Sequence, residues 1–262
     1  MSVLRSGLVS ITFRQLPARE VVRLAREAGL EGIEWGGDVH VPHGDLPAAR
    51  DVRALTEDAG LTIPSYGSYY RVGHDDVPFA AVLDSAVALG APLIRVWAGK
   101  RGAAEADGPY RGVVIEDSRR IADLAAEAGV AVAYEFHGGT LTDTNASAGN
   151  LLVQVAHNSV LSCWQPPQGM PEDECLRGLG IVLPKLAHLH VFSWADDGTR
   201  LPLARREDRW RKYLRAATEG VSEGRTPPGR EHYAMIEFVA GDEPRQLLED
   251  ASTLKRWLAE LG

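Results

Sequence analysis

The sequence predicts a single-domain (β/α)₈ barrel, the TIM barrel, over residues 1–262. Short apolar runs rich in β-branched and aromatic residues alternate eight times with Ala/Leu/Arg/Glu segments of helical spacing. The chain length suits one such barrel, which commonly uses about 250 residues. The main alternative is an open doubly wound sheet. It usually carries a glycine-rich phosphate loop after its first strand, whereas this chain has "RQLPARE" there.

The strands are expected at short apolar runs, and the helices at the segments between them. The predicted strands are Leu8–Phe13, Gly32–Trp35, Thr62–Tyr66, Leu93–Trp97, Ala131–Phe136, Leu161–Trp164, Ala187–Phe192 and Ala234–Phe238. The predicted helices are Pro17–Ala28, Pro47–Ala59, Pro78–Leu89, Val113–Ala128, Ser147–Ala156, Glu172–Leu183, Arg206–Thr218 and Pro244–Leu261. Four helices open with proline, which is tolerated in a first turn, and four end at glycine, which accepts a left-handed cap.

The charge and cysteine content indicate which partners and which cellular compartment to expect. The formal net charge of −8 argues against a nucleic-acid partner, which needs a basic surface. The two cysteines, Cys163 and Cys175, form no Cys-x-x-Cys motif and favour a reducing compartment. Neither a secretory signal nor an apolar stretch of about 18 residues is visible. We therefore expect a cytoplasmic protein with a small-molecule partner. The oligomeric state stays open, with a homo-oligomer among the options.

Polar residues stand at the ends of four consecutive predicted strands, where barrel enzymes place their active sites. They are Glu135, Gln165, His190 and Glu237. Glu135 shares its strand face with small alanines, and Glu237 lies between two large apolar residues that would point outward. Two carboxylates buried on neighbouring strands are costly unless a cation neutralises them. This pattern favours a divalent metal site over the alternative, a buried ion-pair network without metal.

Several motifs resemble the sugar phosphate isomerase/epimerase family, whose members have a xylose-isomerase-like barrel. The motifs are "GIEWGGDVH", "IRVWAG", "YEFHGGT", "LHVFSW" and "MIEFV", and the resemblance covers essentially the whole chain. It implies one metal ion held from strands 5, 6, 7 and 8, with Glu135, His190 and Glu237 as the first, third and fourth ligands. Gln165 replaces the second ligand, an aspartate. It brings an oxygen but no charge, so we expect weaker metal binding.

The expected ligand set of carboxylate and amide oxygens with one imidazole suits Mn²⁺ or Mg²⁺, with Co²⁺ or Zn²⁺ as alternatives. The resemblance implies that Glu135 and Glu237 act as acid and base beside a substrate carbonyl, through a metal-stabilised enediolate. The outcome is isomerisation or epimerisation of a small sugar or keto-sugar. The alternatives are a lyase or hydrolase using the same intermediate, a DNA-repair endonuclease, and a non-catalytic sugar-binding barrel.

Other residues near the same end of the barrel are candidates for binding substrate. They are Trp35, His40, Arg95, Trp97, His137 and Trp194. Indole faces suit the C–H faces of a sugar, and the Arg and His side chains can bond hydroxyl groups. The alternative for the tryptophans is core packing, and for Arg95 a structural ion pair. Arg200, in the long loop after the seventh strand, is a weak candidate to reach a phosphate.

Overall fold

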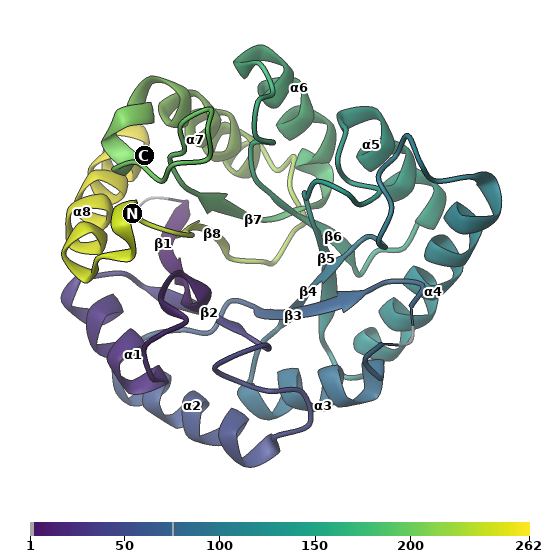
Figure 1. The fold of residues 1–262 in the computed structure, drawn as a ribbon, viewed down its shortest axis with the longest axis horizontal. Coiled ribbons are helices and arrows are strands. Elements are labelled where there is room, and N and C mark those ends of the chain that lie inside the picture. The colour runs from purple at the N-terminus through teal and green to yellow at the C-terminus, as the bar shows by residue number, and fades with distance from the viewer. Residues whose placement is uncertain (1–2, 75) are drawn as a thin grey trace.

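The computed structural model describes residues 3–74 and 76–262 and confirms the (β/α)₈ barrel. Eight strands, all paired in parallel, form a closed barrel in sequence order from β1 to β8, and the pairing of β8 with β1 closes it. Figure 1 shows the helices forming a ring outside this barrel. The carboxyl ends of all strands therefore meet at one mouth of the barrel.

The strands and helices have the following bounds. The strands are β1 (Leu4–Val9), β2 (Gly32–Gly36), β3 (Tyr66–Arg71), β4 (Leu93–Trp97), β5 (Ala131–Glu135), β6 (Val160–Trp164), β7 (Leu186–Val191) and β8 (His232–Ile236). The α-helices are α1 (Ala18–Glu27), α2 (Leu46–Asp58), α3 (Phe79–Leu89), α4 (Gly108–Glu127), α5 (Asn145–Val155), α6 (Glu172–Val182), α7 (Glu207–Ser222) and α8 (Pro244–Leu261). Short 3₁₀ helices are η1 (Ser10–Phe13), η2 (Leu183–Lys185), η3 (Leu203–Arg206) and η4 (Ala240–Asp242).

The first and third strands were placed wrongly by the sequence pattern. The run predicted at Leu8–Phe13 is the end of β1 followed by η1. The run predicted at Thr62–Tyr66 overlaps β3 only at Tyr66, and within it Thr62 makes only an isolated bridge to Gly32. Pro64 in this run has no backbone N–H to offer a neighbouring strand. The true β3 extends to Arg71 and so brings Tyr69 towards the mouth of the barrel.

The core has an outer layer and an inner one. The outer layer lies between barrel and helices and contains most of the large buried side chains. An inner cluster is made mainly of small residues: Leu93, Ala131, Ala133, Leu161, Cys163 and Ala187. Ala131, Ala133 and Glu135 alternate along β5, so the small residues below give way to a carboxylate at the strand end. The barrel interior near the carboxyl end of β5 is therefore lined by the polar side chain of Glu135.

Within the described residues, none of the helices has the length and apolar character required to cross a membrane.

Candidate active site

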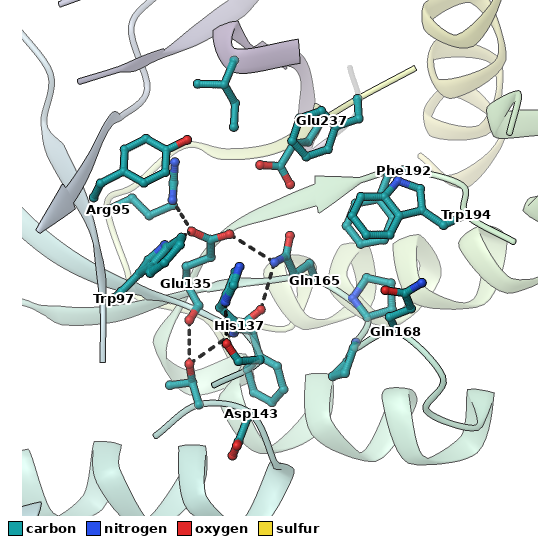
Figure 2. Close-up of a pocket in the computed structure, with 18 of the residues that line it drawn as sticks. Arg95, Trp97, Glu135, His137, Asp143, Gln165, Gln168, Phe192, Trp194 and Glu237 are labelled. Carbon is teal, nitrogen blue, oxygen red and sulfur yellow. Dashed lines mark hydrogen bonds and ion pairs between the residues drawn. The ribbon is translucent and has the colours of Figure 1, made fainter. Parts of the chain in front are cut away.

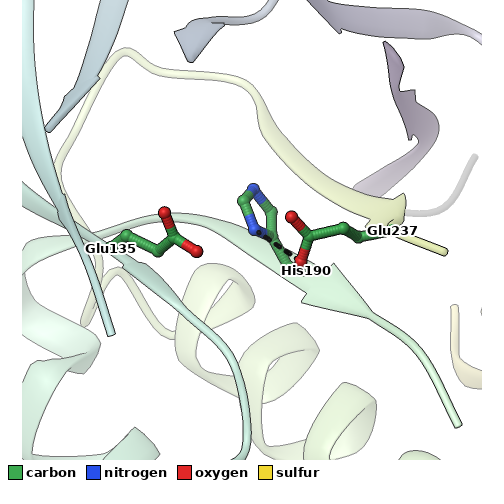
Figure 3. Close-up of side chains that lie close together, drawn as sticks. All are labelled: Glu135, His190 and Glu237. Atoms are coloured by element: carbon green, nitrogen blue, oxygen red, sulfur yellow. Dashed lines mark ion pairs between the residues drawn. The ribbon is translucent and has the colours of Figure 1, made fainter. Parts of the chain in front are cut away.

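Three buried side chains converge inside the mouth of the barrel. Glu135 ends β5, His190 lies on β7, and Glu237 follows β8 directly. Each offers one ligand atom, and these atoms all lie within 4.8 Å of one another. Figure 3 shows the two carboxylates on either side of the imidazole. The structure thus brings together the three residues whose types and strand positions suggested a shared cation.

Contacts of the neighbouring residue Tyr134 and of the Glu237 backbone determine that the two carboxylates point into the barrel. Tyr134, the residue before Glu135, points out of the barrel and donates its hydroxyl hydrogen bond to Ser118 on α4. Glu135 must therefore point inward, since neighbouring strand residues face opposite sides. The backbone N–H of Glu237 donates to the carbonyl of Val191 at 2.9 Å, which extends the β7–β8 pairing by one residue.

Gln165, which follows β6, lies in the same cluster. Its Nε2 donates to Glu135 Oε1 at 3.1 Å and to the Phe136 carbonyl at 3.0 Å. These two bonds orient the amide, and its Oε1 is buried with no hydrogen-bond partner among the described residues. A buried oxygen without a donor is a ready ligand for a hard cation. The donor set of two carboxylates, one amide oxygen and one imidazole therefore fits a divalent metal ion.

A fourth acidic residue, Glu34 on β2, is part of this site and was missed by the sequence analysis. Its fully buried carboxylate accepts hydrogen bonds from Arg95 Nε at 2.7 Å and Ser65 Oγ at 2.6 Å. Its Oε2 also lies 3.4 Å from His190 Nε2. The signal was present, because Glu34 sits between Ile33 and Trp35 as Glu237 sits between two large apolar residues.

Arg95 on β4 links Glu34 to Glu135. Its Nη1 is ion-paired with Glu135 Oε2, and Trp97 Nε1 donates to the same oxygen at 2.5 Å. Glu135 Oε2 is thus fully engaged, whereas Glu135 Oε1 faces Gln165. Figure 2 shows Arg95, Trp97 and Gln165 grouped around this carboxylate. Arg95 was expected as a substrate-binding residue, and the structure places it in ion pairs on the pocket wall.

The charges alternate along a buried chain from Glu135 through Arg95, Glu34 and His190 to Glu237. Burial alone would raise the pKa of Glu34 and Glu135, but Arg95, followed by His190, holds both pKa values below their usual range. Burial alone would lower the pKa of His190, but Glu237 and Glu34 on either side raise it to about 10. Without a metal, His190 is therefore held as a cation between two carboxylates.

A cavity of about 520 Å³ opens above the cluster. Four of the predicted substrate-binding residues line it: Arg95, Trp97, His137 and Trp194. The Trp97 and His137 rings are stacked, with centroids 4.3 Å apart and planes at 23°. Glu135, Gln165 and Glu237 line the same cavity, so three of the four candidate metal ligands face the space that a substrate would fill.

The structure does not bring Trp35 or His40 to this cavity, which corrects their expected position. Trp35 is packed between barrel and helix, where its Nε1 donates to Thr56 on α2 at 3.2 Å. The imidazole of His40 is buried and bonded to Ser10 Oγ and to the Leu16 carbonyl, both at 3.0 Å. His40 thus holds the loops after β1 and β2 together, whereas Trp35 fixes β2 against α2.

Three aromatic residues and one arginine of the wall were not anticipated. They are Tyr69, Phe192, Phe238 and Arg14; Phe238 was expected to point outward, and it instead lines the cavity. Tyr69 and Phe238 have left-handed backbones, with φ of 56° and 63°, a conformation that bulky residues rarely adopt. Tyr69 was missed because the third strand was predicted to end at Tyr66, before Tyr69. Arg14 was missed because the first strand was predicted to run to Phe13, where the structure has η1.

The protein is therefore a (β/α)₈ barrel in which Glu135, His190 and Glu237 form a buried group of candidate metal ligands at the carboxyl ends of the strands. The chain belongs to the xylose isomerase-like TIM barrel family, whose sequence model matches residues 22–220. This match confirms the resemblance carried by the strand motifs. No curated protein sequence matches the chain.

Solved structures of the same fold match along almost the full length. The probable 3-DHS dehydratase AsbF from Bacillus anthracis is 20% identical with a TM-score of 0.76, over 96% of this chain and 99% of that one. A xylose isomerase-like TIM barrel protein from Mycobacterium smegmatis, in complex with magnesium, is 18% identical with a TM-score of 0.73 over 100% of both chains. The 3-keto-D-glucoside 4-epimerase YcjR from E. coli is 18% identical with a TM-score of 0.70, over 98% of this chain and 99% of that one. At these identities the likeness establishes the shared fold.

Proposed function

We propose that the protein is a divalent-metal-dependent isomerase or epimerase of a small sugar or keto-sugar. The observation that carries this proposal is the set of three buried ligand atoms, within 4.8 Å of one another, beneath a cavity of about 520 Å³. The magnesium complex of a protein with the same fold and the epimerase with the same fold both support it.

Glu135 Oε1, His190, Glu237 and Gln165 Oε1 would hold the ion. Mg²⁺ or Mn²⁺ suits these donors best, with Co²⁺ or Zn²⁺ as alternatives. When bound, the ion supplies Lewis-acid polarisation of the substrate carbonyl. Because Arg95 and Trp97 already occupy Glu135 Oε2, the ion would bind the other oxygen, Oε1, which also accepts from Gln165 Nε2.

The chain's own residues supply the proton transfers. Glu237 and Glu135 approach the cavity from different strands, and one removes the proton beside the carbonyl while the other returns it. Glu237 is the better placed base, since among the described residues its carboxylate makes no hydrogen bond or ion pair besides the 3.4 Å approach to His190 Nδ1. Trp97, His137 and Trp194 would position the substrate ring and limit water.

Deuterium uptake tests this chemistry directly. The metal-loaded protein is incubated in D₂O with a panel of ketoses that includes D-fructose and D-psicose, and exchange beside the carbonyl is followed by NMR. We expect exchange with the wild type and its loss in Glu237→Gln. Glu249→Gln changes an exposed carboxylate on α8 and should exchange normally. Exchange that survives in Glu237→Gln would contradict the role of Glu237.

A lyase acting on the same kind of substrate is the second candidate, favoured by the dehydratase among the similar structures. The two reactions differ in product mass, because isomerisation conserves mass and dehydration loses one water. Mass spectrometry of the products therefore separates them.

We also propose a cytoplasmic location and a small-molecule partner. Cys163 and Cys175 are both buried and unpaired, which suits a reducing compartment.

A further inference from the structure

Three aromatic rings form one wall of the cavity next to Glu237. We call Phe192, Trp194 and Phe238 the aromatic shelf. The Phe192 and Trp194 centroids are 4.9 Å apart with planes at 33°, and those of Trp194 and Phe238 are 6.0 Å apart with planes at 42°. All three rings line the cavity, and Phe238 follows Glu237 in the chain. Such a surface suits the C–H face of a ring-shaped molecule rather than a highly hydrated group.

The shelf also carries an unused donor. Trp194 Nε1 is buried and has no hydrogen-bond partner among the described residues. A buried N–H without an acceptor is costly, and a ligand hydroxyl could satisfy it. The shelf therefore offers both apolar area and one polar anchor to the same ligand.

The arginines of the cavity wall are already neutralised. Arg14 is ion-paired with Asp38 and donates from Nη2 to the Tyr69 hydroxyl at 2.5 Å. Arg95 is ion-paired with both Glu34 and Glu135. Among the described lining residues, no lysine or arginine is left to balance a phosphate group.

The loops after β7 and β8 are acidic, although this corner commonly binds phosphate in barrels of this architecture. Besides Glu237, their acidic residues are Asp196, Asp197, Asp242 and Glu243, against Arg200, Arg205 and Arg206. Arg200 is ion-paired with Asp242, and its guanidinium lies 4.0 Å from the centre of the Phe238 ring. Arg206 donates to the Trp194 carbonyl at 3.0 Å and lies 3.6 Å from Asp196. The suggestion that Arg200 reaches a phosphate finds no support in these contacts.

We propose that the substrate is an uncharged ring compound, a non-phosphorylated cyclic keto-sugar or its glycoside, that lays one face on the aromatic shelf. This inference rests on the proposed function and names its substrate class. The cavity of about 520 Å³ holds a single sugar ring and leaves room for a substituent. Contact with Phe238 and Trp194 would bring the ring beside Glu237.

Matched pairs of neutral and phosphorylated sugars test the proposal. The Mg²⁺-loaded protein is titrated with D-fructose and D-psicose, and with the 6-phosphates of the same two ketoses. Binding is followed by calorimetry. We expect at least one neutral sugar to bind, about tenfold or more tighter than its phosphate. Tighter binding of any phosphate, or no binding of any neutral sugar, would overturn the proposal. Mg²⁺ binding is measured first, because its absence would overturn the proposed function instead.

Two variants probe the features that carry the inference. Trp194→Leu should weaken binding of the neutral sugar about tenfold, while Trp194→Phe retains most of it and both keep their Mg²⁺ affinity. Asp38→Asn releases Arg14 from its ion pair, so it should improve the binding of the phosphates relative to the neutral sugars. A neutral sugar that binds Trp194→Leu as tightly as wild type would contradict the role of the shelf.

Discussion

Glu34 Oε1 accepts a hydrogen bond from Arg95 Nε at 2.7 Å, with both side chains fully buried inside the barrel. Through this pair, residues of β2 and β4 orient the candidate metal ligands, which come from β5 to β8. Arg95 holds one oxygen of Glu135, and Glu34 faces Nε2 of His190. His190 is therefore oriented with Nδ1 towards Glu237, the side on which the cation would bind.

Replacing Glu34 with glutamine should weaken metal binding. The variant loses the charge that orients His190 and balances Arg95, and the loss of a carboxylate behind a ligating histidine typically costs about 10–100-fold in metal affinity. Calorimetric titration with Mn²⁺ measures this change. Asp250→Asn is the matched control, because Asp250 is a buried carboxylate on α8 that accepts from the Leu203 N–H at 2.8 Å. Equal loss of metal affinity in both variants would mean that Glu34 acts only through general stability.

Gly67 on β3 leaves the space that the Arg95 guanidinium occupies. A Cβ at this position would lie 2.5 Å from Arg95 Nη2 and 3.0 Å from Glu34 Oε1. Gly67→Ala should therefore displace the ion pair, lower the free energy of unfolding by about 1–3 kcal/mol and slow deuterium exchange into substrate. Thermal unfolding and the exchange assay measure the two effects. Gly112→Ala on α4 meets nothing within 4 Å and should leave both unchanged or slightly improved. Wild-type exchange by Gly67→Ala would contradict the prediction.

Replacing Gln165 with glutamate should change metal affinity and metal-free stability in opposite directions. A third carboxylate strengthens the binding of a hard cation, and we expect Mn²⁺ to bind about tenfold tighter or more. The same change removes the Nε2 donor to Glu135 Oε1 and the Phe136 carbonyl, so the metal-free variant should unfold at a lower temperature. An unchanged Mn²⁺ affinity would show that the residue at this position does not reach the ion.

The metal-free protein should lose stability as the pH rises from 7 to 10. Its folded-state His190 pKa of about 10 exceeds the ordinary value of 6.5, because Glu237 and Glu34 favour the cation. This contribution is complete below the unfolded pKa and is lost as the pH rises through the folded one. The difference in unfolding temperature between wild type and His190→Gln isolates the contribution, and it should shrink over this pH range. A constant difference would contradict a protonated His190.

The periodic pattern predicted most of the fold because its signals are local. All eight helices appear at the predicted segments, several of which follow proline or precede glycine, whereas α5 begins after Thr144 and ends before Ala156. The first and third strands were misplaced because short apolar runs do not by themselves define where a strand ends. The start of α4 was placed at Val113 although the helix begins at Gly108, where the Asp107 side chain accepts from the Tyr110 N–H and Pro109 occupies the first turn.

Strand parity and residue type correctly predicted that Glu135, His190 and Glu237 lie close together inside the barrel. Glu34 satisfies the same parity criterion on β2 but was missed, because the expected ligands came only from strands 5 to 8. Trp35, near the end of β2, and His40, beyond it, were assigned to the substrate, but a strand-end position does not distinguish a side chain facing the cavity from one facing a helix.

Metal content and affinity, measured on protein first stripped with a chelator and then titrated with Mn²⁺, test the central claim most directly. One ion should bind per chain, and both Glu135→Gln and Glu237→Gln should weaken its binding by about tenfold or more, whereas Glu249→Gln should not. A stripped wild-type protein that binds no divalent ion, or variants that bind it as tightly as wild type, would show that Glu135, His190 and Glu237 do not form a metal site.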